Sequence, residues 1–377
     1  MFGMHTGYII SCTKDGNAIT DIPSDVVAPA ATTITFDDNL RLGDGVDIYF
    51  SRDLRTSKHS KRLEAFEGKP WLKYGLGYTV LRNIPLYDGS YCSFGEPHVL
   101  YREDKNLEIA LRRSNAMERL CLHVGDTFTI YPCMRGHYIE KQNAYSVKQI
   151  YDRDRFSSDE QYANFRPLIH CSGIYRSASP FDDIYRRRDF VLACTQRHGI
   201  ASILDFADTE SELMQLLEDD LDYVSDLYRN KRVIAAGNDS GIYSLEFSQS
   251  VIEGLRKLIK LPKPWLIHCR AGKRRSGFVC ALLEGIAGAN FTELVQDYML
   301  SYEYNNGITQ ADNPLAYHTI ARETIIEMLD YIRTKPEPDE IDDMLNVNWH
   351  QQCLGFLLTH GMTLDEALEL KRLVTSA

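Results

Sequence analysis

The sequence has few positive charges for its size and no long apolar run. Its 377 residues include 42 Lys and Arg against 53 Asp and Glu, which gives a formal net charge of -11. Because phosphate backbones attract basic surfaces, this balance argues against nucleic acid as the main partner. No apolar run approaches the ~20 residues that span a bilayer, so no integral membrane contact is expected. The first residues have no basic start followed by an apolar stretch, so no secretory signal is expected.

The nine cysteines form no CxxC pair and show no spacing typical of a metal site. We therefore expect no metal and no cofactor. An odd number of cysteines without a disulfide framework fits a reducing compartment. We expect a cytoplasmic protein, in which a reactive thiol is permitted.

Positive charge is nevertheless concentrated in one stretch. Between Glu253 and Glu284 there are eight Lys or Arg residues and no acid. In an acidic protein, such a stretch attracts anions to one place.

Residues 1–155 predict a β-rich domain, because short alternating runs are separated by Gly, Asp and Asn. Two of these runs share a pattern, LRLGDGVDIYF (40–50) and LHVGDTFTIYP (122–132). In each, a Gly-Asp pair suited to a tight turn precedes an alternating strand. Duplicated units of a small barrel would produce this pattern, and so would chance similarity between two hairpins. The pattern resembles the Gly-Asp box of cradle-loop barrels.

The polar, aperiodic segment 151–167 predicts a linker. Beyond it, expected strands alternate with expected helices, which predicts a mostly parallel central sheet flanked by helices. The clearest of these elements are a strand at 199–206, a helix at 244–261, a strand at 264–269 and a helix at 276–288. We therefore expect a second domain over residues 160–377.

The most informative segment is HCRAGKRRSG (268–277), here called the signature loop, which lies between an expected strand and an expected helix. Backbone N–H groups at a helix N-terminus bind anions, and Gly272 permits a close approach of the backbone. Arg275 can hold a phosphate through two parallel hydrogen bonds. Cys269, at the head of the loop, is expected to ionise and attack phosphorus, which gives a phosphocysteine. Ser276 can donate to the sulfur when it leaves.

The signature loop resembles that of the protein tyrosine phosphatase superfamily, His-Cys-x5-Arg-Ser/Thr-Gly. Its Ala-Gly-Lys is similar to bacterial tyrosine phosphatases and to phosphatase-and-tensin type lipid phosphatases. Three flanking segments resemble the bacterial branch: IYRSASP (174–180), DYMLSYEYNNGI (297–308) and HGMTLDEALELKRLV (360–374). The resemblance covers residues 165–377 and implies an α/β phosphatase domain there. It leaves the β-rich part of the chain before it unexplained.

The resemblance implies that Cys269 and Arg275 are catalytic. The residues expected to bind the phosphate are Arg270, Ala271, Gly272, Lys273, Arg274 and Ser276. We expect His268 to support the loop by hydrogen bonds and not to act as a base. Arg176 is expected to contact the loop or the substrate, although a structural ion pair is an equal alternative.

The sequence departs from the bacterial pattern at Arg274, where the relatives carry an acid that can take part in proton transfer. In the wider superfamily, an aspartate about thirty residues before the cysteine has this role. Asp239 stands at this distance before Cys269, in GNDSG (237–241), between two glycines that can act as hinges. It would protonate the leaving oxygen and then activate water. A plain turn is the alternative for this segment, and Asp208 is the second candidate acid.

The signature loop carries three cations besides Arg275. Extra cations favour substrates with several phosphates, and also phosphotyrosyl peptides in an acidic context. The resemblance leads us to expect a protein tyrosine or dual-specificity phosphatase first. An inositol polyphosphate or phosphoinositide phosphatase is the alternative, and a phosphate-binding scaffold without turnover is the second alternative.

Overall fold

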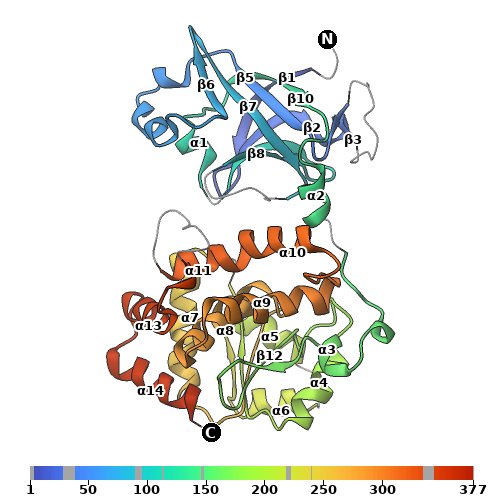
Figure 1. Ribbon diagram of the computed structural model, residues 1–377, viewed down its shortest axis with the longest axis vertical. Coiled ribbons are helices and arrows are strands. Elements are labelled where there is room, and N and C mark those ends of the chain that lie inside the picture. The colour runs from blue at the N-terminus through green and yellow to red at the C-terminus, as the bar shows by residue number, and fades with distance from the viewer. Residues whose placement is uncertain are drawn as a thin grey trace. The chain divides into compact units, whose positions relative to one another are not determined.

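The computed structural model describes residues 4–28, 39–89, 96–112, 114–145, 148–217, 222–238, 240–333 and 344–376. The chain forms two compact units, Met1–Ser146 and Val147–Ala377 (Figure 1). None of the helices in the described ranges is both long and apolar enough to cross a membrane.

The N-terminal unit is β-rich, as predicted. Seven strands pair in the order β5-β10-β1-β2-β9-β8-β7, and β7 pairs back with β5, so they form a closed ring. These strands are β1 (His5–Cys12), β2 (Ala18–Pro23), β5 (Gly45–Phe50), β7 (Tyr78–Tyr87), β8 (Pro97–Leu100), β9 (Asn106–Leu111) and β10 (Thr127–Met134). Strand β6 (Leu72–Gly75) adds to β7, and β3 (Val27–Ala28) pairs with β4 (Leu40–Arg41). The helical segments are η1 (Ser24–Val26), η2 (Leu54–Thr56), η3 (Ser60–Phe66), α1 (Ala116–Arg119) and α2 (Ile139–Tyr145).

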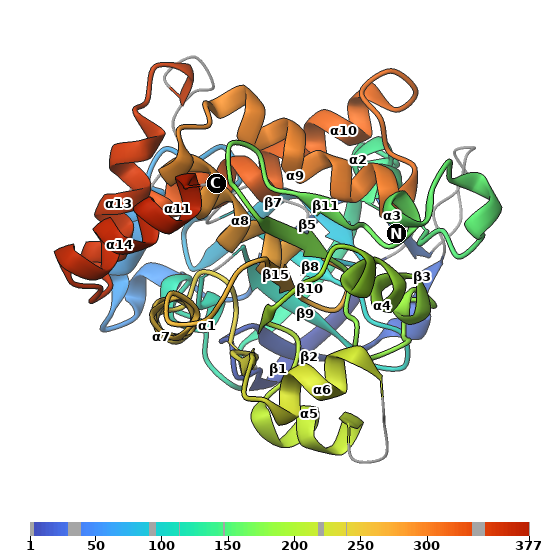
Figure 2. The same cartoon turned by 90° about the horizontal axis from the view of Figure 1, so that it is seen from below.

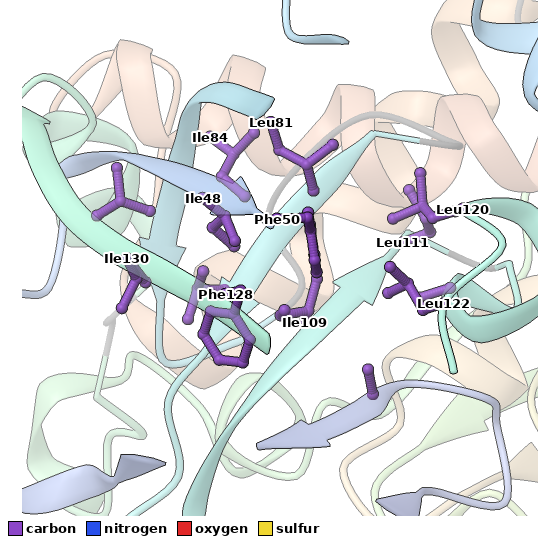
Figure 3. Close-up of a cluster of buried hydrophobic side chains, with 14 of the residues drawn as sticks. Ile48, Phe50, Leu81, Ile84, Ile109, Leu111, Leu120, Leu122, Phe128 and Ile130 are labelled. Carbon is purple, nitrogen blue, oxygen red and sulfur yellow. The ribbon is translucent and has the colours of Figure 1, made fainter. Parts of the chain in front are cut away.

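A hydrophobic core fills the ring of strands. Successive side chains of a strand point to opposite faces, so Ile48 and Phe50 are fully buried while Tyr49 between them is exposed. Figure 3 shows Phe50, Phe128 and Ile109 meeting in this core from three strands. Burial of such side chains is the main term that stabilises the unit.

The two Gly-Asp segments lie side by side in this ring. Strands β5 and β10 pair antiparallel with Ile48 opposite Ile130. These two isoleucines occupy the same position of the repeated pattern in their respective segments. The pairing is therefore symmetric about them, as a local twofold axis requires.

The aspartates of the two turns have equivalent contacts. Each accepts the backbone N–H of the residue three positions earlier, at 3.1 Å in Asp44 and 2.8 Å in Asp126. Each also pairs with an arginine that follows the strand of the other segment. The Asp44–Arg135 distance is 2.8 Å and the Asp126–Arg52 distance is 2.6 Å. This exchange of partners favours a duplicated unit over chance similarity.

The C-terminal unit contains a five-stranded sheet in the order β11-β12-β15-β13-β14. All its pairings are parallel except that of β11 with β12. The strands are β11 (Arg166–Pro167), β12 (Ile174–Ser177), β13 (Ser202–Asp205), β14 (Val233–Ala235) and β15 (Trp265–His268). Helices pack on both faces, with α4 and α6 on one side and α8, α9 and α13 on the other (Figure 2).

The helical segments of this unit occupy most of the remaining chain. They are η4 (Arg153–Arg155), α3 (Asp159–Tyr162), α4 (Arg188–Arg197), α5 (Glu210–Leu217), α6 (Tyr223–Arg229), α7 (Leu245–Leu258), α8 (Arg274–Ala287), α9 (Phe291–Asn306), α10 (Pro314–Ala321), the π-helical η5 (Arg322–Ile326), α11 (Glu327–Ile332), α13 (Trp349–Thr359) and α14 (Leu364–Thr375).

The prediction of a linker over residues 151–167 is wrong. The segment contains η4, α3 and β11, and Tyr162 and Phe165 in it are each 2% exposed. Several of its polar side chains have structural partners: the Ser158 hydroxyl, for example, caps α3 by accepting the N–H of Gln161. A polar segment without periodicity can therefore form a short, capped helix and an edge strand, and need not be a solvent-exposed linker.

Candidate active site

The signature loop connects the central strand β15 to helix α8. Strand β15 ends at His268, which lies opposite Ser177 of β12 and Asp205 of β13. The carboxyl ends of three parallel strands therefore meet beside the loop. Ligands of open α/β sheets bind at this edge.

Cys269 lines a cleft of about 460 Å³. It is 7% exposed, and its Sγ is 3.2 Å from the Oγ of Ser276 in the first turn of α8. The serine hydroxyl is thus in place to donate to the sulfur. Of the residues predicted to bind phosphate, Arg270, Ala271, Lys273 and Arg274 line the cleft together with Arg275.

Gly272 has a backbone conformation that other residues adopt rarely. Its φ is +67°, and a Cβ atom there would lie 2.3 Å from the carbonyl oxygen of Ser177. Both the left-handed conformation and the lack of space require glycine. The tight approach of the loop to β12 depends on this residue.

Three buried side chains donate hydrogen bonds to the carbonyl groups of the loop. Asn164 Nδ2 donates to the carbonyl oxygens of Ala271 at 3.3 Å and Gly272 at 3.0 Å. Asn305 Nδ2 also donates to the Ala271 carbonyl, at 3.3 Å. Arg176 Nη2 donates to the Gly272 carbonyl at 3.0 Å. Because C=O and N–H of a trans peptide point in opposite directions, the N–H that follows Gly272 is turned away from these groups.

Arg176 contacts the loop and is too deeply buried to touch substrate. It is 1% exposed, and its Nη1 lies 2.6 Å from Asp297 Oδ2. Asp297 also pairs with Arg166 at 2.8 Å. These two arginines hold the pKa of Asp297 at about 2, despite its burial. Arg176 thus contacts the loop and also forms a structural ion pair, so these two alternatives hold together.

His268 is buried under the loop. Burial lowers its pKa to about 3, so the ring is neutral near pH 7. Neither ring nitrogen has a hydrogen-bond partner within the described ranges. The ring lies 5.2 Å from that of Phe181, against which it packs.

The cations of the loop have different surroundings. The side chain of Arg270 is 50% exposed, and its Nη2 is 3.7 Å from Asp208 Oδ1. Lys273 Nζ donates to Asn306 Oδ1 at 2.9 Å, and burial lowers the lysine pKa to about 8. Arg274 is exposed.

Arg275 is bound to two backbone carbonyls. Its Nη1 donates to Phe206 and its Nη2 to Ser240, each at 3.1 Å. Both acceptors are neutral, so the guanidinium has no carboxylate partner in these bonds. A phosphate oxygen, being charged, would be a stronger acceptor.

The predicted general acid Asp239 lies outside the described residues. Its sequence neighbours are at the site, because Asn238 lines the cleft and Ser240 accepts from Arg275. The second candidate, Asp208, is 3% exposed. Burial, together with the charge of Asp182, raises the pKa of Asp208.

The residues at this site that the sequence did not predict include Asn164, Asn305, Asp205 and Tyr185. Asp205 is fully buried, with Oδ1 at 3.6 Å from His268 Nε2, and burial raises its pKa well above the usual range. Tyr185 lines the same cleft as Cys269, and burial, followed by the charge of Cys269, raises the pKa of the tyrosine. The signal in the sequence was the position of Asp205 and Asp208 at the end of the buried strand expected over residues 199–206.

A model of the tyrosine phosphatase family matches residues 174–352. This part of the chain belongs to the protein tyrosine phosphatase superfamily, as predicted, and the protein is a cysteine-dependent phosphatase. No curated protein matches the chain.

Two solved structures of Siw14 are similar to this chain. The core catalytic domain of the PP-IP phosphatase Siw14 from S. cerevisiae, in complex with citrate, is 20% identical, and the match covers 44% of this chain and 88% of that one, with a TM-score of 0.27. A second structure of the Siw14 catalytic core is 17% identical over 49% of this chain and 94% of that one, also with a TM-score of 0.27.

Proposed function

We propose that this protein hydrolyses phosphotyrosyl or other phosphorylated protein side chains through a phosphocysteine on Cys269. The observation that carries the proposal is the 3.2 Å contact between Sγ of Cys269, which lines the cleft, and Oγ of Ser276. In the first step, the thiolate forms an S–P bond while the bond between phosphorus and the leaving oxygen breaks. In the second step, water attacks phosphorus, and the thiolate leaves with a hydrogen bond from Ser276.

Arg275 binds the phosphate in this proposal. Its guanidinium exchanges the carbonyls of Phe206 and Ser240 for two phosphate oxygens, and the backbone N–H groups of the signature loop bind the others. Arg270, Lys273 and Arg274 add positive charge along the cleft. His268 and Arg176 support the loop without touching the phosphate.

Asp239 is proposed as the general acid, with Asp208 as the alternative. The positions of Asn238 and Ser240 support Asp239, and the raised pKa of Asp208 supports the alternative. The acid donates its proton to the leaving oxygen, and its carboxylate then accepts a proton from the attacking water. No catalytic role is assigned to the N-terminal unit, which is proposed to be an accessory domain.

The walls of the cleft support the proposed substrate class. Tyr185 offers an aromatic surface beside Cys269, against which a phosphotyrosyl ring can pack. The four cations that line the same cleft favour inositol polyphosphates or phosphoinositides as the second candidate, because each further phosphate would meet a positive charge.

A turnover panel tests the proposal. We expect hydrolysis of a phosphotyrosyl peptide to exceed that of a phosphoseryl peptide, inositol hexakisphosphate and phosphoinositides. Cys269→Ser should abolish turnover of every substrate while retaining orthovanadate or phosphate binding. Activity should persist in a chelator. A preference for the inositol compounds would move the assignment to the second candidate, and turnover by Cys269→Ser near the native rate would disprove the mechanism.

A further inference from the structure

Residues 148–150, here called the entry strap, are bound to the C-terminal end of α9. Gln149 Nε2 donates to Asn305 Oδ1 at 3.0 Å, and the Ile150 N–H donates to the Asn305 carbonyl at 2.8 Å. Asn306 Nδ2 donates to the Lys148 carbonyl at 3.3 Å. These bonds hold the strap to two consecutive asparagines.

The same two asparagines bind the signature loop. Asn305 Nδ2 donates to the Ala271 carbonyl at 3.3 Å, and Asn306 Oδ1 accepts from Lys273 Nζ at 2.9 Å. Asn305 is fully buried. Each asparagine therefore forms hydrogen bonds both with the strap and with the signature loop.

The hydrogen bonds of Asn305 fix which way its amide faces. Its Nδ2 donates to the carbonyls of Ala271 and Ser301, the latter at 2.7 Å, while its Oδ1 accepts from Gln149. An amide carries two donors on nitrogen and only acceptors on oxygen. Turning the amide over, so that its oxygen and nitrogen exchange places, would put oxygen against two carbonyl oxygens. Gln149 opposes that rotation, because its Nε2 can donate to Asn305 only when the Asn305 oxygen faces the strap.

Arg187 also links the strap to the end of α9. It is 1% exposed, and its Nη2 donates to the carbonyls of Ile150 at 3.3 Å and Tyr304 at 2.9 Å. The strap is thus attached to the end of α9 both directly and through a buried guanidinium. Such a connected arrangement transmits a displacement of the strap to the asparagines, because buried polar groups stay paired.

We propose that the entry strap positions the signature loop, and that Gln149 is a positioning residue for phosphate binding, acting through Asn305. The proposal rests on the proposed function for its turnover readout. The strap begins two residues after Ser146, the last residue of the N-terminal unit.

A double-mutant cycle in the full-length chain tests this proposal. Gln149→Glu keeps the size of the side chain but replaces the donor by an oxygen that repels Asn305 Oδ1. We expect a roughly 5–10-fold loss in kcat for a small aryl phosphate, the effect of one hydrogen bond, and a similar loss in affinity for orthovanadate. Gln196→Glu, at an exposed position of α4, makes the same chemical change and should have no effect on either.

The second arm of the cycle is Asn305→Asp, which removes the donor to Ala271. If the strap acts through Asn305, the double variant should lose no more than Asn305→Asp alone. If Asn305→Asp does not fold, as judged by its melting temperature, Asn305→Ser replaces it. Additive losses, or native orthovanadate affinity in a folded Gln149→Glu, would overturn the proposal. Orthovanadate binding needs no turnover, so this readout remains valid even if the proposed substrate is wrong.

Discussion

Arg275 Nη2 donates to the carbonyl oxygen of Ser240 at 3.1 Å. Ser240 follows Asp239 in the sequence, so this bond attaches the backbone beside Asp239 to the arginine that is proposed to hold the phosphate. The two residues are 35 positions apart in the chain. Because phosphate would take over this donor, substrate binding and the placement of residue 240 are linked.

Replacing Arg275 by Lys keeps the charge but removes the planar pair of donors. We expect a fall in kcat of at least about 100-fold, because a single ammonium cannot hold two phosphate oxygens in parallel. Steady-state kinetics on a small aryl phosphate measure this loss. Arg197→Lys is the matched control, since the Arg197 side chain lies on helix α4 outside the cleft and is 54% exposed. A nearly native Arg275→Lys would show that the phosphate is held elsewhere.

The general acid can be identified by the leaving group. Asp239→Asn should reduce turnover of a phosphotyrosyl substrate by about 10²–10⁴-fold, the usual contribution of general acid catalysis. An activated aryl ester, whose leaving group departs unaided, should lose much less. The basic limb of the pH profile should flatten in this variant, because the acid must be protonated.

Asp208→Asn is the parallel variant. Because the pKa of Asp208 is raised, this carboxyl would stay protonated to a higher pH than an ordinary aspartate and could act as the acid in its place. A silent Asp239→Asn together with a damaging Asp208→Asn would assign the role to Asp208. Equal losses on both substrates would mean that the mutated aspartate shapes the loop.

Gly272→Ala should inactivate the enzyme and destabilise the domain. The positive φ costs a non-glycine residue about 1–2 kcal/mol, and the new Cβ would overlap the Ser177 carbonyl at 2.3 Å. Gly355→Ala is the control: no atom lies within 4 Å of its Cβ position in helix α13, so the change should be neutral or stabilising, since alanine favours helix by about 1 kcal/mol. Thermal melting and kcat measure both. An active Gly272→Ala with a native melting temperature would contradict the role of this glycine.

Asp205 should make stability depend on pH. A carboxyl whose folded pKa is raised keeps its proton in the folded state after the unfolded chain has released it. Its stabilising contribution is therefore fully present below about pH 4 and is lost as pH rises through the folded pKa. Asp205→Asn cannot titrate, and its Oδ1 can still accept the Ala207 N–H.

The measurement is the melting temperature from pH 4 to pH 8. The melting temperature of the native protein should fall relative to that of Asp205→Asn as the pH rises. The same substitution at the exposed Asp15 is the control for the effect of replacing a carboxylate by an amide. A constant difference at Asp205 would show that the carboxyl has an ordinary pKa.

The sequence by itself determined the features that depend on near neighbours in the chain. The signature loop, with Cys269, Arg275 and Ser276, is one short continuous segment between a strand and a helix, so its chemistry could be predicted directly. The Gly-Asp segments were visible for the same reason. Their equivalence became meaningful only when Ile48 was found opposite Ile130.

The tertiary structure alone decided how the loop is held. Asn164 lies 108 residues before Gly272 and Asn305 lies 34 residues after Ala271, yet both bind loop carbonyls. Asp205 reaches His268 only because β13 and β15 end at the same edge of the sheet. Asparagine and aspartate are common in turns, so their residue type gives no sign of burial. Asn164 and Asn305 became buried donors, and Asp205 a buried carboxyl, because distant segments pack at the ends of the parallel strands. The sequence predicted the groups that react, and the fold selected those that hold them in place.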